Sequence, residues 1–146
     1  MIGNAEDARM AVMAYRNGDM HNIFSRDGST RDVYLINGVL YKVENGGLIG
    51  INADEYDYIN NMRDSLPSGV HFPDTALYRI LGEDVIATDR IIGQLKYKCY
   101  DQEIGDECDD FCLSDQEIEM LTGYSQDMSG FNTIVNDDGY WIIDCL

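Results

Sequence analysis

The sequence predicts an α+β fold in which a small antiparallel sheet carries a helix. Two turn dipeptides, Asn37-Gly38 and Asp138-Gly139, each lie between short runs of alternating apolar residues, which is typical of β-hairpins. Between these hairpins, residues 52–63 carry apolar side chains at three- and four-residue spacing, which predicts an amphipathic helix. A chain of 146 residues suits one domain with a core of its own.

Two helices are expected in the first half of the chain. Residues 4–17 predict the first one, because Asn4 can cap its start and Gly18 can end it. The second is expected to begin near Asn52, whose side chain is suited to cap it. Glu55 then has the spacing of the partner residue in such a cap.

The sequence patterns that predict the remaining elements are weaker. Residues 76–92 predict a second hairpin that turns at residues 82–84. Residues 94–111 have no clear period, so we expect mostly loop there. Ser114 and Glu117 have capping-box spacing, which predicts that a third helix begins at this point.

The composition disfavours some classes of function. There are 27 acidic and 10 basic residues, a formal net charge of −17, and a chain this acidic repels a nucleic-acid backbone. Such a charge keeps a protein soluble, and it also allows an acidic face to dock on a basic partner. No apolar run approaches the roughly 18 residues of a membrane span, and the N-terminus lacks the regions of a secretion signal. We therefore expect a cytoplasmic protein that binds neither membranes nor, directly, nucleic acid.

The cysteines give little support for a metal centre. Their spacing contains no CxxC pair, and the two histidines, His21 and His71, lie far from them in sequence. In a reducing cytoplasm we expect free, partly buried thiols instead. The four residues are Cys99, Cys108, Cys112 and Cys145.

Three oxygen-bearing side chains near the end of the chain suit a hard cation. Asp127 and Asn132 stand five residues apart, and Asp144 follows twelve residues later, at the end of an apolar strand. The predicted hairpin would return Asp144 to the side on which Asn132 lies. Phosphoryl transfer requires such acids to hold Mg²⁺ and a carboxylate near the attacking hydroxyl.

This segment resembles the catalytic loop and magnesium-binding strand of protein kinases, written HRDxxxxN and DFG. The resemblance implies that Asp127 is the catalytic base and that Asn132 and Asp144 bind the metal. It departs from the kinase pattern in two places, because Ser125 replaces the usual histidine and Cys145-Leu146 replaces phenylalanine and glycine.

Segments further upstream resemble the kinase N-lobe in the right order. Lys42, in the sequence LYKV, matches the strand lysine that binds ATP phosphates, and Glu55 would be its ion-pair partner. The segment before the first hairpin resembles a reduced glycine-rich loop, so Gly28, Ser29 and Thr30 would contact the nucleotide. The sequence DVIATDRIIG resembles the strand that leads into the hinge.

The resemblance covers roughly residues 24–144 and implies a protein-kinase-like domain that uses ATP and Mg²⁺. Residues 1–93 would form the N-lobe, a small antiparallel sheet with a helix, and residues 94–146 a vestigial C-lobe. Short, divergent kinase-like proteins of bacteriophages are the most similar kind, which implies a host protein as the target. Because the sequence ends two residues after Asp144, we expect no activation segment and no substrate platform unless a homodimer completes the lobe.

Each candidate site residue also has a purely structural interpretation. Asp127, Asn132 and Asp144 are residue types common in turns. Lys42 can lie in solvent at the end of a strand, and Glu55 can belong to the cap of its own helix.

Two functions therefore stay open. The first is a kinase-like phosphotransferase or nucleotide-binding protein. The second is a catalytically inactive acidic module that inhibits a host defence or transcription protein by occupying its basic surface. An acidic segment interleaved with aromatic residues is the candidate surface for the second function. Its residues are Tyr97, Tyr100, Asp101, Asp106, Glu107, Asp109, Asp110 and Phe111.

Overall fold

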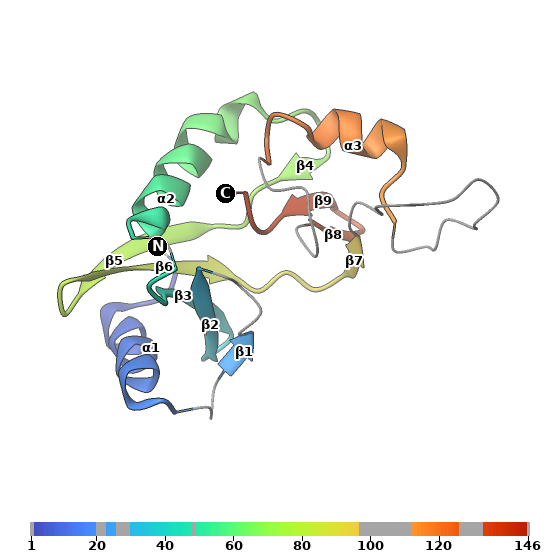
Figure 1. Cartoon of the computed structure of the whole chain (residues 1–146). Helices are drawn as coiled ribbons and strands as arrows, with labels where there is room; N and C mark the ends of the chain where they lie inside the picture. Colours follow the sequence, from blue (N-terminus) through green and yellow to red (C-terminus); the bar gives the residue numbers. More distant parts are fainter. Residues whose placement is uncertain are drawn as a thin grey trace. The chain divides into compact units, whose positions relative to one another are not determined.

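The chain forms two compact units in a computed structural model that describes residues 2–19, 23–25, 30–47, 49–96, 112–125 and 133–145 (Figure 1). One unit combines Met1–Asn60 with Asp74–Arg90, and the other combines Asn61–Pro73 with Ile91–Leu146. The first unit has an antiparallel sheet, the second has a mixed sheet, and both contain helices. The α+β class is therefore confirmed. The kinase resemblance implied an N-lobe of residues 1–93, whereas residues 61–73 and 91–93 group with the second unit.

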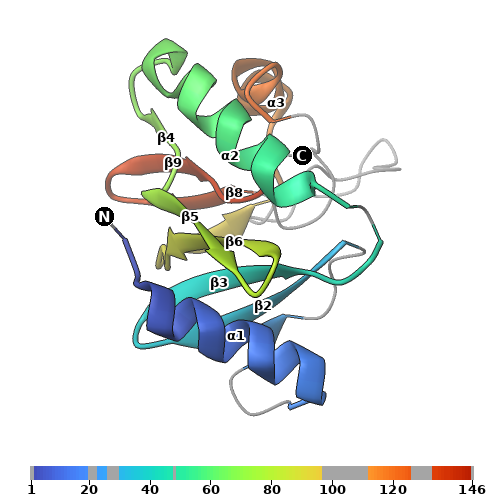
Figure 2. The same ribbon diagram turned by 90° about the vertical axis from the view of Figure 1, so that its left-hand side faces the viewer.

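The first unit is built on a five-stranded antiparallel sheet with the strand order β1-β2-β3-β6-β5. Helix α1 packs on one face of this sheet (Figure 2). The small side chains Ala8 and Ala11 let α1 approach Tyr34 and Tyr41, and these residues form the centre of the buried core. The element bounds are α1 Ala5–Asn17, β1 Ile23–Ser25, β2 Arg31–Ile36, β3 Val39–Glu44, β5 Thr75–Ile80 and β6 Glu83–Asp89.

Both predicted ends of α1 are confirmed. The side chain of Asn4 accepts a hydrogen bond from the Asp7 backbone N–H at 2.8 Å, and Gly18 ends the helix in the left-handed region at φ 67°. The Tyr41 hydroxyl accepts from the Asn4 backbone N–H at 3.3 Å. The start of α1 is therefore fixed to the sheet as well as capped.

The two hairpins of the first unit turn over two residues each. Asn37 and Gly38 connect β2 to β3 with φ 50° and 78°, the left-handed pair that a type I′ turn requires. In the second hairpin the left-handed residues are Leu81 and Gly82, at φ 50° and 83°, and β6 begins at Glu83. The turn therefore lies at residues 81–82 and not at the predicted residues 82–84, because residues 83 and 84 pair in the ladder with β5.

Helix α2 (Ile51–Met62) follows β3 and continues into the short 3₁₀ helix η1 (Arg63–Ser65). The prediction that Asn52 caps α2 is wrong, because Asn52 lies inside the helix. A carboxylate oxygen of Glu44 accepts from the Asn52 backbone N–H at 3.0 Å, so β3 itself supplies the acceptor for this helix terminus. Because Glu44 binds this backbone N–H, the side-chain amide of Asn52 is available for tertiary contacts.

The second unit contains a four-stranded sheet with the order β4-β9-β8-β7. The predicted last hairpin is present, and β4 pairs with β9 in parallel. Helix α3 begins with the predicted capping box between Ser114 and Glu117. Residues 94–96, expected as loop, form a strand because they pair with β8, whereas residues 97–111 lie outside the described part of the chain. The bounds are β4 Val70–His71, β7 Gln94–Lys96, α3 Asp115–Leu121, β8 Thr133–Asn136 and β9 Gly139–Ile142.

The expectation of free thiols fails at one cysteine. Cys112 is disulfide-bonded, whereas Cys145 is a buried thiol. Cys99 and Cys108 lie outside the described residues. Among the helices that the structure describes, none is both long and apolar enough to cross a membrane.

Candidate functional site

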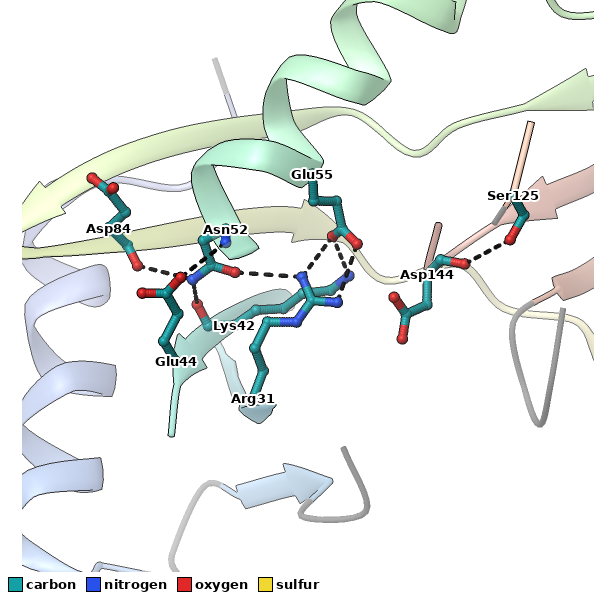
Figure 3. A network of polar contacts seen from close by, with 8 residues as sticks. All are labelled: Arg31, Lys42, Glu44, Asn52, Glu55, Asp84, Ser125 and Asp144. Atoms are coloured by element: carbon teal, nitrogen blue, oxygen red, sulfur yellow. Dashed lines mark hydrogen bonds and ion pairs between the residues drawn. The ribbon is translucent and has the colours of Figure 1, made fainter. Parts of the chain in front are cut away.

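A buried ion pair joins the middle strand of the first unit to helix α2. The ammonium nitrogen of Lys42 in β3 lies 2.8 Å from Oε1 of Glu55 in α2 (Figure 3). Glu55 is 1% exposed and Lys42 is 8% exposed. The contact that the kinase resemblance implied between these residues is thus formed.

The strand pattern explains why Lys42 points towards α2. Tyr41 and Val43, on either side of it, are both in the core cluster that α1 covers. Because successive side chains of a strand point to opposite faces, Lys42 must project to the face away from α1. Glu55 meets it on that face from the first turns of α2.

Arg31 is a second cation on the same carboxylate. Its Nη1 lies 2.9 Å from Oε1 of Glu55, and its Nη2 donates to Oε2 at 3.1 Å. Arg31 therefore binds Glu55 through two parallel bonds, the geometry that a guanidinium favours. The side chains of Arg31 and Glu55 are 5% and 1% exposed.

We did not predict Arg31 from the sequence, although the hairpin register contains a signal for it. The turn at Asn37-Gly38 pairs Val33 with Lys42, so these two residues share a face of the sheet. Arg31 stands two residues before Val33 and so lies on the same face, diagonal to Lys42.

Asn52 completes the cluster and is fully buried. Its side-chain Nδ2 donates to the backbone carbonyl of Lys42 at 2.9 Å and to that of Asp84 at 2.8 Å. Its Oδ1 accepts from Nη1 of Arg31 at 3.4 Å. Since residues three apart share a face of a helix, Asn52 and Glu55 together form a polar seam between α2 and the sheet (Figure 3).

The charges of the cluster hold Glu55 ionised. Burial alone would raise the pKa of its carboxyl, but Lys42 and Arg31 outweigh burial and lower the pKa to about 2. A fixed carboxylate of this kind restrains a lysine ammonium at one place, where it can act as a point charge for a phosphate group.

The other predicted nucleotide contacts are only partly described. Thr30 directly precedes β2, and its backbone carbonyl accepts from the Asn45 N–H at 2.9 Å. Gly28 and Ser29 lie outside the described residues. A glycine-rich phosphate loop in this segment therefore stays a prediction.

The predicted metal ligands belong to the second unit. Asp144 lies two residues beyond β9, and its backbone carbonyl accepts from the Ser125 hydroxyl at 3.1 Å (Figure 3). Asp127 and Asn132 lie outside the described residues. Within the described part, no group of three or more His, Cys, Asp or Glu side chains is arranged to hold a metal ion. The magnesium site stays a prediction.

Comparison with known proteins gives no family assignment. No protein-family model and no curated protein matches the chain.

Proposed function

We propose that this chain is a kinase-like protein that binds ATP with Mg²⁺, and that Lys42, held by Glu55, contacts the nucleotide phosphates. The 2.8 Å ion pair between Lys42 and Glu55 is the observation that carries this proposal. In protein kinases a strand lysine and a helix glutamate form such a pair, and the lysine contacts the phosphates of ATP. Here the same two residue types come from a central strand and the helix that directly follows it.

The energetics of buried ion pairs support a functional role for this one. Removing two charges from water costs several kcal/mol per ion, and apolar side chains of similar volume often stabilise a fold as well or better. Stability alone is therefore a weak reason to bury Lys42 and Glu55 at 8% and 1% exposure. A requirement for a positioned cation gives a stronger reason.

The remaining kinase-like residues have roles that follow from the chemistry. Asn132 and Asp144 would hold Mg²⁺, which would neutralise charge on the phosphate oxygens. Asp127 would accept the proton of a protein hydroxyl as its oxygen takes the γ-phosphoryl group from ATP and ADP leaves. The target would be a host protein if the chain is encoded by a phage.

The net charge of −17 favours a second candidate function, an acidic module that occupies a basic surface of a partner protein. A docking surface of this kind does not require a buried lysine–glutamate pair, whereas a nucleotide site does. Nucleotide binding therefore separates the two candidates, and we propose the first.

Thermal unfolding with and without ATP and Mg²⁺ tests the proposed function. A ligand at a hundred times its dissociation constant stabilises the native state by about 2.7 kcal/mol, which raises the midpoint by several degrees. We expect this rise in the parent protein and in Glu119→Ala, which removes an exposed carboxylate of α3. We expect Asp144→Ala to lose it.

The midpoints without ligand show whether each variant is folded. A parent protein that shows no rise at millimolar nucleotide would contradict the proposed function and would direct attention to the acidic module. A rise that Asp144→Ala retains in full would leave the nucleotide site standing and remove Asp144 from it.

A further inference from the structure

Glu55 has two cationic partners where the proposed function requires only one. Arg31 binds both carboxylate oxygens, whereas Lys42 shares Oε1 with it. If Lys42 left this oxygen, Glu55 would keep two charge-assisted hydrogen bonds and a counter-charge from Arg31. The buried carboxylate would therefore still have a cationic partner. Loss of a partner in a buried ion pair is costly when it leaves a buried charge uncompensated.

Asn52 links α2 to the sheet through bonds that do not involve the Lys42 side chain. Its amide donates to the backbone carbonyls of Lys42 in β3 and Asp84 in β6, at 2.9 and 2.8 Å. Its carbonyl oxygen accepts from Arg31. Arg31 thus contacts two residues of α2, one helical turn apart, and both contacts survive removal of the lysine ammonium.

We propose that Arg31 and Asn52 are positioning residues that hold α2 and Glu55 on the sheet independently of Lys42. Lys42, still paired with Glu55, can then contact a nucleotide phosphate while the attachment of α2 to the sheet does not depend on its ammonium. The role given to Lys42 rests on the proposed function, whereas the anchoring of α2 rests on the contacts alone.

This arrangement has a consequence for regulation. In protein kinases the position of the corresponding helix decides whether the lysine–glutamate pair forms, and activation controls that position. A helix fixed by Arg31 and Asn52 keeps the pair assembled without an activating step. The nucleotide site of this chain would therefore be permanently competent.

Hydrogen exchange tests the anchoring, because it measures local opening of α2 separately from global unfolding. The ratio of exchange rates in α2 to those in β3 and β6 is compared among the parent, Lys42→Met, Arg31→Met and Asn52→Asp. The last variant places a carboxylate against two backbone carbonyls. Asn60→Asp, an exposed position of the same helix, makes the same change of charge as a control.

We expect Lys42→Met and Asn60→Asp to change this ratio by less than about threefold. Arg31→Met and Asn52→Asp should raise it by about tenfold or more, because each removes buried bonds to a charged group or to backbone carbonyls. Arg31→Lys keeps the charge without the two parallel bonds, so we expect an intermediate increase. If Arg31→Met does not fold, the exchange ratio of Arg31→Lys tests whether Arg31 holds α2 on the sheet.

A ratio that rises as much in Lys42→Met as in Arg31→Met would overturn the proposal, since Lys42 would then hold the helix. An unchanged ratio in both Asn52→Asp and Arg31→Lys would overturn it as well. Nucleotide binding by the parent is measured on the same samples. If the exchange ratios follow our expectation and no nucleotide binds, the proposed function fails while the positioning roles stand.

Discussion

At 1% exposure, the carboxylate of Glu55 depends on Lys42 and Arg31 to remain charged. Its pKa is lowered from 4.5 to about 2, because the two cations outweigh the effect of burial. A lowered pKa in the folded state means that ionisation of Glu55 stabilises the fold at pH values above about 4.5. This contribution is lost as the pH falls from about 4.5 to about 2.

Substitution of Glu55 by Gln should therefore have a pH-dependent effect on stability. At pH 7 we expect it to reduce the free energy of unfolding by about 3–5 kcal/mol, the cost of removing one partner of a buried ion pair. The difference from the parent should shrink as the pH is lowered from 4.5 to about 2. Urea unfolding of both proteins across this range measures it.

Asp57→Asn, an exposed position of α2, is the matched control and should change stability by less than about 0.5 kcal/mol. A stability difference for Glu55→Gln that is the same at pH 7 and near pH 2 would show that the charge of Glu55 does not contribute.

The pair of Lys42 and Glu55 could be anticipated from the sequence. A lysine in a predicted strand, followed by a glutamate in the next predicted helix, is the order found in protein kinases. The contacts of Arg31 and Asn52 could not be anticipated in the same way. Asparagine is a preferred N-cap residue, but α2 begins at Ile51, so Asn52 is its second residue and its backbone N–H donates to the tertiary acceptor Glu44. The position of Arg31 beside Lys42 follows only from the register of the hairpin formed by β2 and β3.

At the scale of elements, strong local signals predicted what formed. The two-residue turn at Asn37-Gly38 and the capping box at Ser114 are local chemistry, and both are present. Strands β4 and β7 were missed because they have two and three residues, too few for a period to show. Their existence depends on β9 and β8, which are distant in sequence.

Helix α3 has only seven residues and needs tertiary contacts to persist. Glu117 supplies them, because it accepts a hydrogen bond from the Tyr140 hydroxyl in β9 and lies 3.5 Å from the Lys96 ammonium in β7. The bond to Glu117, together with burial, raises the pKa of Tyr140 to about 12. The hydroxyl thus stabilises the second unit below about pH 10, and this contribution is lost as the pH rises through about 12.

We expect Tyr140→Phe to reduce the stability of the second unit by about 1–2 kcal/mol at pH 7, since a partly exposed bond to a charged group is lost. Urea unfolding followed by the fluorescence of Trp141, the single tryptophan, reports on this unit. The difference between the variant and the parent should disappear above pH 12.

Tyr124→Phe is the control, because the described residues form no hydrogen bond with the Tyr124 hydroxyl. An equal loss of stability in the two variants would show that the contact with Glu117 is not what fixes α3.

At the scale of the whole molecule, a sheet with the lysine–glutamate pair forms one unit and the predicted metal-binding hairpin belongs to the other. The sequence predicted the α+β class, because hairpins and helices follow from local patterns. It did not predict that residues 61–73 join the second unit, since this depends on the pairing of β4 with β9. The kinase-like interpretation, the acidic segment and the magnesium site stay predictions.

The central claim is that Lys42 binds the phosphates of a nucleotide. Isothermal titration calorimetry with ATP and Mg²⁺ on Lys42→Met tests it most directly, with Lys96→Met as the control. The two variants lose the same charge, and Lys96 pairs with Glu117 in the second unit. We expect the affinity of Lys42→Met to fall roughly 10- to 100-fold, the loss of a charge-assisted bond, while Lys96→Met stays near the parent. Equal affinity of a folded Lys42→Met and the parent would contradict the account.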